Sequence, residues 1–600
     1  MQMKNIRANK AFKYVFMFFF FLSFFVNHAF SCIDSGINLL AVDSKSGSAA
    51  DIPFLVRVIN NNGNDIFVNI ANISYDDNLQ QSIANAYKIA SSKANKNCSV
   101  VVLFPTRSKE LAGPSGGLGI ALAFYKSFSE SNINIDEYGI TGALDEQGNV
   151  LPVGGILEKV EAAIKSGKKK VIIPITDRFD YIMLKYLYPD IKVYYVLNFD
   201  QALSVINNNA GNVSAEQFLF FDLAKDRAML NSLKQSSYKY DFAIYYERLK
   251  EDYNVTLQHL RNKIDKNAYD YYENILSYAE QLKDKGYYYS ASNTLFTNAV
   301  ELMSFDAIIN NRDVKKEAEQ CINEAKSLKV ESNKNNFELI SGALFRLARA
   351  EERLIRKVED NTKSAKAYLA KAHAESLEWC KFSSSLLNNA MSINGDKINE
   401  EAIKDYAVNY ILSVDENSLT DEEKEFYMLG LKYAAKQDFI TSAFYVAYLN
   451  SSLSSVQYKG QKLDGFWANV FASQAEYLYS ISGNTASASS SFALALSFNN
   501  IYNLVTQSTV LEDTGLENIN KGGNKTSIEN ISEEKLNEST NKSVNESSNE
   551  IKAKGQEENA ASIALSLSLF IIAIILLYLL TKYYGNQEKR KKARYKYERR

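Results

Sequence analysis

Residues 98–128 read CSVVVLFPTRSKELAGPSGGLGIALAFYKSF, and this stretch decides the fold expected for the N-terminal part of the chain. The apolar run 98–104 predicts a buried strand, and the run 116–128 predicts a helix. Between them stands Gly113-Pro114-Ser115-Gly116-Gly117, where small residues favour a tight turn. A strand, a turn and a helix in direct succession are typical of an α/β domain.

Strand-like and helix-like runs alternate on both sides of this stretch. We expect strands over 37–43, 52–60, 65–73, 137–144, 148–153, 169–174 and 191–198, and helices over 78–94, over 154–167 and after residue 198. The alternation predicts an α/β domain of about 175 residues, which we bound at 32–209.

From about residue 215 to 510 the strand signals vanish, and charged amphipathic helices dominate. Three stretches, 279–302, 432–450 and 472–498, share a small-residue helix, a turn and a second helix, which is similar to degenerate helix-hairpin repeats. An irregular helical bundle is the alternative that we favour. Residues 511–559 are rich in Asn, Ser, Glu and Lys without apolar periodicity, which predicts a disordered linker.

Both ends of the chain carry membrane signals. Four basic residues precede an apolar run of 13 residues at 14–26, and the small-residue site Ala29-Phe30-Ser31 follows, so we expect a signal peptide over 1–31. Residues 560–581 hold 22 residues without a charge, which is long enough to span a bilayer. Nine Lys or Arg residues in the tail 582–600 predict a cytoplasmic C-terminus, with the rest of the chain outside the cell membrane.

Cysteines and glycosylation motifs agree with an extracellular location. The four cysteines allow three disulfide connectivities, and we favour Cys32 with Cys98 and Cys321 with Cys380 because each pair lies inside one expected domain. Ten Asn-x-Ser/Thr motifs occur. Five of them fall between Asn524 and Asn545, which predicts that the 511–559 linker is a glycosylated stalk.

Composition excludes several classes of function. The formal net charge of −2 and the lack of a basic stripe argue against nucleic-acid binding. The chain has only His28, His259 and His373, and the last two lie in expected helices. These positions exclude a histidine-rich metal site and also the histidine that a Gly-x-Ser-x-Gly hydrolase would need. We expect no metal and no cofactor.

Four separated blocks carry a family resemblance: Gly113–Gly117, Thr141-Gly142, Val150–Lys159 and Ala162–Pro174. In this order they resemble the proteolytic domain of the Lon peptidase family, whose members use a serine and lysine dyad. The resemblance covers roughly 36–209. The chain as a whole resembles the stand-alone, membrane-anchored Lon-like peptidases of archaea, although no Gly-x4-Gly-Lys-Ser/Thr motif for an ATPase is present.

The resemblance implies that Ser115 is the nucleophile, Lys159 the general base 44 residues later, and Thr141 a hydroxyl near the lysine. A serine is a weak nucleophile unless a base takes its proton, and a lysine is a base only when burial lowers its pKa by roughly 3 units. Backbone N–H groups of Gly116 and Gly117, at a helix start, suit an oxyanion.

Three positions depart from the family pattern: Ala112 and Ala143 stand where acidic residues are common, and Gly116 where alanine is common. The sequence predicts an ATP-independent serine endopeptidase acting on polypeptides, with the helical region selecting or gating the substrate. The alternative is a catalytically inactive surface scaffold or peptide-binding protein built on the helical region. The oligomeric state stays open, and a homo-oligomer is one of the options.

Overall fold

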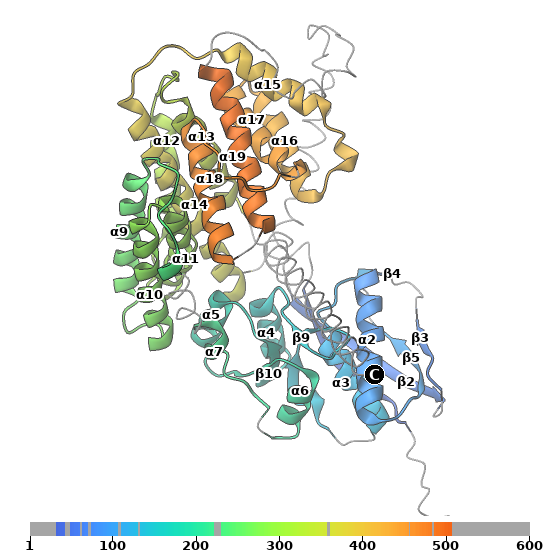
Figure 1. The fold of residues 1–600 in the computed structure, drawn as a ribbon. Helices are drawn as coiled ribbons and strands as arrows, with labels where there is room; N and C mark the ends of the chain where they lie inside the picture. The colour runs from blue at the N-terminus through green and yellow to red at the C-terminus, as the bar shows by residue number, and fades with distance from the viewer. Residues whose placement is uncertain are drawn as a thin grey trace, which may run out of the picture. The chain divides into compact units, whose positions relative to one another are not determined.

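The computed structural model describes residues 32–42, 49–60, 63–69, 74–105, 110–129, 133–209, 211–220, 230–356, 361–454, 456–482 and 485–506. These residues form two compact units (Figure 1). The expected signal peptide, stalk, membrane span and basic tail lie outside the described residues. Within the described ranges, no helix is both long and apolar enough to cross a membrane.

The first unit is built on two main sheets, and its described residues fall within 32–42, Ala49–Thr176 and Pro189–Ala215. A four-stranded sheet has the order β1-β2-β5-β3 and is antiparallel except between β3 and β5. Its strands are β1 (Ser35–Val42), β2 (Ala49–Asn60), β3 (Ile66–Val68) and β5 (Ser99–Leu103). Helices α2 (Asp77–Ala94) and α3 (Gly117–Ser129) pack against each other, and α3 packs on β1 and β2.

The second sheet of this unit is parallel, with the order β11-β10-β7. Its strands are β7 (Tyr138–Ile140), β10 (Lys170–Pro174) and β11 (Lys192–Val196), and helices α4 (Ile156–Lys165) and α6 (Phe199–Ile206) lie in the same region of the chain. Two short pairs, β4 (Ser74–Tyr75) with β6 (Glu110–Leu111) and β8 (Ala143–Leu144) with β9 (Val150–Leu151), complete it. The expected α/β alternation is therefore confirmed.

One expected strand is divided. The sequence predicts a single strand over 137–144, whereas the structure ends β7 at Ile140 and begins β8 at Ala143. The break falls at Thr141-Gly142, where Gly142 has a φ of +149°. A side chain at Gly142 would also approach Val150 within 2.7 Å, so this position favours glycine for both its conformation and its space.

The second unit is all-helical and comprises Asp177–Tyr188 and the described residues from Glu216 onward. Its helices are α5 (Arg178–Leu187), α7 (Glu216–Leu219), α9 (Ala243–His259), α10 (Lys266–Asp284), α11 (Tyr288–Ile309), α12 (Val314–Ser327), α13 (Phe337–Leu354), α14 (Lys363–Met391), α15 (Glu400–Ser413), α16 (Asp421–Ala435), α17 (Phe439–Leu453), α18 (Phe466–Ser482) and α19 (Thr485–Thr506). The three stretches expected as helix hairpins correspond to the packed pairs α10 with α11, α16 with α17, and α18 with α19.

Helix α5 connects β10 to β11 along the chain but belongs to the second unit. Phe179 stacks on Phe305, with ring centroids 5.6 Å apart. The Tyr368 hydroxyl donates to the Asp180 carboxylate (3.0 Å), and the Tyr181 hydroxyl donates to Glu216 (2.6 Å). These contacts make α5 an integral part of the helical unit, although its sequence lies within the range predicted for the α/β domain.

Both favoured disulfides are present. Cys32 pairs with Cys98 in the first unit, with Cα atoms 6.6 Å apart, and Cys321 pairs with Cys380 in the second, with Cα atoms 6.1 Å apart. The first bond attaches the segment before β1 to the start of β5, and the second joins α12 to α14. The predicted connectivity is thus confirmed.

Candidate active site

The loop that carries Ser115 is a tight turn at the start of α3. Gly113 has a φ of +86°, and the Gly117 N–H donates to the Pro114 carbonyl oxygen over 3.0 Å. Ser115 is partly exposed, and its hydroxyl makes no hydrogen bond with any described residue. The turn therefore presents the serine side chain without committing its oxygen to the protein.

The N-cap residue of α2 and one residue within that helix hold this turn in place, and sequence reasoning missed both. Asp76 is the N-cap of α2: its carboxylate accepts from the Leu79 N–H (2.8 Å) and also from the Gly113 N–H (3.1 Å). The Ser82 hydroxyl donates to the Pro114 carbonyl oxygen over 3.3 Å. Asp76, two residues before the predicted helix 78–94, was the available signal for a cap, but nothing in the sequence indicated the second contact.

The Thr141-Gly142 break in the strand encloses the Ser115 backbone. The Thr141 hydroxyl donates to the Ser115 carbonyl oxygen (3.1 Å), and the Gly142 N–H donates to the same oxygen (2.9 Å). In return, the Gly142 carbonyl oxygen accepts from the Leu118 N–H (2.9 Å). Thr141 is fully buried. The structure therefore brings Thr141 to the backbone of Ser115, and no described hydrogen bond joins it to Lys159.

Lys159 lies in the first turn of α4, which begins after Gly155 in the left-handed conformation (φ +67°). Only 4% of Lys159 is exposed, and its Nζ donates to the Gly154 carbonyl oxygen over 2.9 Å. Burial lowers the pKa of Lys159 to about 8. The negative charge of Glu158 acts in the other direction and raises the pKa, but by less than burial lowers it. At this pKa roughly one molecule in ten carries the neutral amine at pH 7, compared with fewer than one in a thousand for an exposed lysine.

The starts of α3 and α4 meet the same strand. A Cβ atom at Gly119 would lie 2.8 Å from the Leu39 side chain, and one at Gly155 would lie 2.9 Å from the Val42 side chain. Leu39 and Val42 are three residues apart on β1, which is a distance of roughly 10 Å. Both helices therefore pack against β1, but side chains three residues apart on a strand point to opposite faces of it, so these contacts do not bring the Ser115 turn to Lys159. No described hydrogen bond joins the Ser115 hydroxyl to Lys159 Nζ.

Gly116 and Gly117, whose N–H groups are expected to stabilise an oxyanion, differ in whether those groups already have a hydrogen-bond acceptor. The Gly117 N–H is used by the turn, where it donates to Pro114. The Gly116 N–H has no acceptor within the described part of the chain. At the N-terminal end of α3, Gly116 is the donor that an oxyanion could use without breaking an existing bond.

Histidine takes no part in this site. His259 ends α9 and His373 lies in α14, so both belong to the helical unit, as the sequence predicts. Across the described residues, no group of three or more His, Cys, Asp or Glu side chains is arranged to hold a metal ion.

Residues 63–207 match the family model for the Lon protease (S16) C-terminal proteolytic domain. This region is a Lon-type proteolytic domain. The class of enzyme that the match supports is a serine endopeptidase, in agreement with the resemblance seen in the sequence.

Curated Lon proteases are similar to part of the chain. Lon protease 2 of Borreliella burgdorferi is 34% identical over 137 residues, which are 22% of this chain and 17% of the relative. The archaeal Lon proteases of Thermoplasma acidophilum (34% over 103 residues) and Archaeoglobus fulgidus (39% over 89 residues) cover 17% and 15% of this chain, and 15% and 14% of their own lengths. The chain therefore spans less than a fifth of the length of these relatives.

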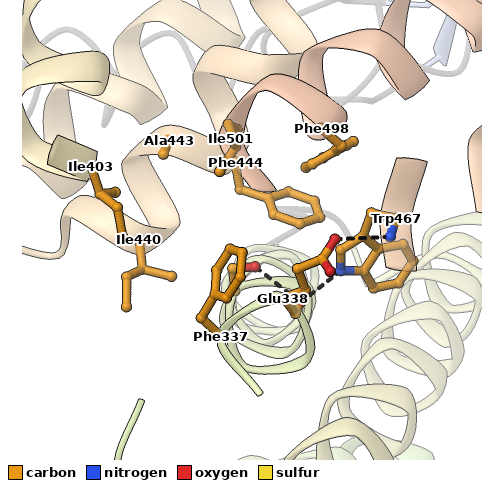
Figure 2. Close-up of a pocket in the computed structure, with 10 residues that line it drawn as sticks. Phe337, Glu338, Ile403, Ile440, Ala443, Phe444, Trp467, Phe498 and Ile501 are labelled. Carbon is orange, nitrogen blue, oxygen red and sulfur yellow. Dashed lines mark hydrogen bonds between the residues drawn. The ribbon is translucent and has the colours of Figure 1, made fainter. Parts of the chain in front are cut away.

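A separate pocket lies in the helical unit, around a buried carboxyl group (Figure 2). The Glu338 carboxylate, on α13, accepts from the N–H groups of Phe466 (2.8 Å) and Trp467 (3.1 Å) and so caps the start of α18. Burial raises the pKa of Glu338 to about 7, and these two hydrogen bonds oppose the rise. Aromatic and aliphatic side chains such as Phe444 and Ile440 form the rest of the lining. Ser341 also lines the pocket, and its hydroxyl donates to the Glu338 carbonyl oxygen over 3.0 Å. This arrangement anchors a helix.

Proposed function

We propose that the protein is an ATP-independent serine endopeptidase in which Ser115 is the nucleophile and Lys159 the general base. The observation that supports this most directly is the buried Lys159, whose pKa burial lowers to about 8, in the same Lon-type domain as the Ser115 turn. An amine that is partly neutral near pH 7 can take a proton from a hydroxyl, which an ordinary lysine cannot do efficiently.

The reaction begins when neutral Lys159 leaves the Gly154 carbonyl and accepts the proton of the Ser115 hydroxyl. The serine oxygen bonds to the peptide carbonyl carbon, and the carbonyl oxygen becomes an oxyanion that the Gly116 N–H stabilises. Protonated Lys159 then gives its proton to the leaving amine, and the C–N bond breaks. Water, deprotonated by Lys159, releases the acyl group and restores Ser115.

Thr141 acts as a positioning residue in this scheme. Together with Gly142 it fixes the Ser115 carbonyl oxygen by two hydrogen bonds, and Asp76 fixes the turn from its other end through Gly113. These contacts hold the backbone on both sides of the nucleophile, so the hydroxyl is the part of Ser115 that stays free to rotate. A reacting atom held within a narrow range of positions lowers the entropic part of the barrier.

Titration of the full-length protein with a fluorophosphonate probe tests the assignment. We expect stoichiometric labelling of Ser115 and cleavage of an unfolded polypeptide without ATP. Ser115→Ala should lose both, whereas Ser92→Ala, which removes an exposed hydroxyl from α2, should retain both. A folded wild-type protein that neither labels nor cleaves would reject the peptidase and favour the binding-protein alternative.

We further propose that the body of the chain lies outside the cell membrane. The apolar runs 14–26 and 560–581 support this, as do the basic tail and two disulfides, which persist in oxidising compartments. Protease added to intact cells should remove the body and leave a short C-terminal fragment. Full-length chain recovered after this treatment would contradict the topology. Mass analysis of 511–559 from the native host should show added glycan.

A further inference from the structure

A cation is buried in the helical unit, far in the sequence from the proposed active site. Arg346, on α13, is 2% exposed, and its guanidinium lies between the rings of Phe382 and Trp467, at 4.4 Å and 4.3 Å from their centroids. Its Nη1 donates to the Gly342 carbonyl oxygen over 2.9 Å. Its Nε is buried and finds no acceptor among the residues that the structure describes.

The charges around Arg346 leave its own charge unbalanced. Arg248 pairs with Asp252 (3.2 Å) and approaches Glu378 (3.8 Å), while Lys381 pairs with the same two carboxylates (3.1 Å and 3.5 Å). These two cations and two anions therefore neutralise each other. In the described ranges Arg346 forms no ion pair, although a guanidinium stays protonated when buried and isolated buried charge is costly.

A pocket opens beside this cation. Arg346 and Arg248 line it together with Ser292, whose buried hydroxyl has no hydrogen-bond partner within the described residues. The rest of the wall is mainly aromatic, and it includes Phe242, Tyr245, Tyr289, Phe296, Trp379 and Phe382. The pocket thus combines an apolar wall with one unneutralised cation and one unsatisfied hydroxyl, which is the composition of a site for an amphipathic anion.

The cation is held in position from behind. Trp467, which stacks on Arg346, donates its indole N–H to the Glu338 carbonyl oxygen over 2.6 Å, and its backbone N–H to the Glu338 carboxylate (Figure 2). A Cβ atom at Gly342 would overlap the indole ring, so α13 lies directly against it. Because both stacking and hydrogen bonding fix the guanidinium, the site is organised before a ligand arrives.

We propose that this pocket binds a carboxylate carried on an aromatic or other apolar body, with the carboxylate paired to Arg346 and accepting from Ser292. A single carboxylate matches the single unbalanced charge, whereas a dianion such as phosphate would leave a negative charge buried. The ring-lined wall offers an aromatic surface against which the apolar body can pack. This inference does not depend on the peptidase activity, because every residue in it belongs to the helical unit.

Two sources can supply this chemistry: the C-terminus of a peptide with an apolar last residue, or a free aromatic acid. Calorimetry with the full-length Ser115→Ala protein, which cannot degrade a peptide if the proposed nucleophile is correct, separates them. The probes are N-acetylphenylalanine, a pentapeptide ending in phenylalanine, and the C-terminal amide of each. We expect at least one free acid to bind ten-fold or more tightly than its amide. Preference for the pentapeptide identifies a C-terminus site, and preference for the small acid identifies a metabolite site.

Arg346→Met should abolish the difference in affinity between the free acid and its amide. Arg346→Lys should weaken binding but keep the preference for the acid, because lysine retains the charge without the planar guanidinium. Arg261→Met, which removes an exposed charge from the same unit, should change neither. Circular dichroism establishes that each variant is folded. Equal binding of acid and amide by the wild type, or no binding of any probe, would overturn the proposal and leave Arg346 as a packing residue.

Discussion

Lys159 and Arg346 are both buried cations, and their comparison shows how the two units use the same feature differently. They are 4% and 2% exposed, and each donates to a glycine carbonyl oxygen on its own helix or just before it, Gly154 and Gly342. Burial lowers the pKa of Lys159 to about 8, so the amine can shed its proton. A guanidinium cannot do so at working pH, and its buried charge instead calls for an anion.

The surroundings of each cation agree with this division. Lys159 stands at the start of α4, in the same unit as a turn whose serine hydroxyl has no partner among the described residues. Arg346 stands between two aromatic rings and beside a hydroxyl, with no described carboxylate to neutralise it. Lysine in a buried site therefore supplies a proton acceptor, and arginine in a buried site supplies a fixed positive charge.

Replacing the lysine at position 159 by arginine gives the largest expected effect. Lys159→Arg should reduce kcat/KM for peptide cleavage by about 10³-fold or more, as Ser115→Ala should, because arginine cannot act as the base. Lys165→Arg, on the exposed side of the same helix, is the matched control and should retain activity. Cleavage assays with circular dichroism decide the matter. A folded, active Lys159→Arg protein would remove lysine from the mechanism.

The pH dependence of cleavage gives the second largest effect. In the proposed mechanism the neutral amine of Lys159 is the active form, so kcat/KM should rise with pH and level off above a pKa of about 8. Between pH 6 and pH 8 this amounts to roughly a 50-fold increase for a single titrating group. Initial rates from pH 6 to 9.5 measure it. A profile that levels off near pH 6.5 would point to histidine and contradict a buried lysine base.

The sequence predicts the local elements of the first unit better than the contacts between them. The blocks around Ser115, Thr141 and Lys159 are local in the chain, and local spacing suffices to predict a strand, a turn and a helix. The contact between Asp76 and Gly113 joins residues 37 positions apart, and it depends on how α2 packs beside the turn. No periodicity contains that information.

The second unit shows the same limit more strongly. The hairpins were predictable because small residues, a turn and a second helix follow one another in each stretch. The burial of Arg346 was not predictable, because it results from contacts with Phe382 and Trp467, which are distant from it in the sequence. The membership of α5 in this unit also depends on distant partners such as Phe305 and Tyr368.

Removal of one hydroxyl at Thr141 should have a smaller effect on the active site than removal of the base. Thr141→Val keeps the shape of the side chain but loses the hydrogen bond to the Ser115 carbonyl oxygen, which contributes about 1 kcal/mol, or roughly five- to ten-fold in kcat/KM. Thr141→Ser restores a hydroxyl and should recover part of the rate. Because the effect is on positioning, the pKa seen in the pH profile should stay near 8. A shift of that pKa would indicate that Thr141 acts on Lys159 instead.

The smallest expected effect concerns an acid, Glu338, and so extends the comparison beyond the two buried cations. Burial raises the pKa of Glu338 to about 7, so the folded helical unit holds a proton that the unfolded chain releases near pH 4.5. The contribution of Glu338 to the free energy of unfolding should therefore be highest below pH 4.5. It should fall as the pH rises toward 7 and stay constant above pH 7. Hydrogen bonds to two backbone N–H groups and partial exposure reduce the expected loss to about 1 kcal/mol.

Both tryptophans of the chain, Trp379 and Trp467, lie in the second unit, so urea unfolding followed by tryptophan fluorescence reports on that unit. Glu338→Gln should flatten the dependence between pH 5 and pH 7.5, while Glu401→Gln, an exposed change on α15, should not. If wild type and Glu338→Gln lose stability in parallel over this range, another group is responsible, and the cap of α18 holds its carboxylate ionised throughout.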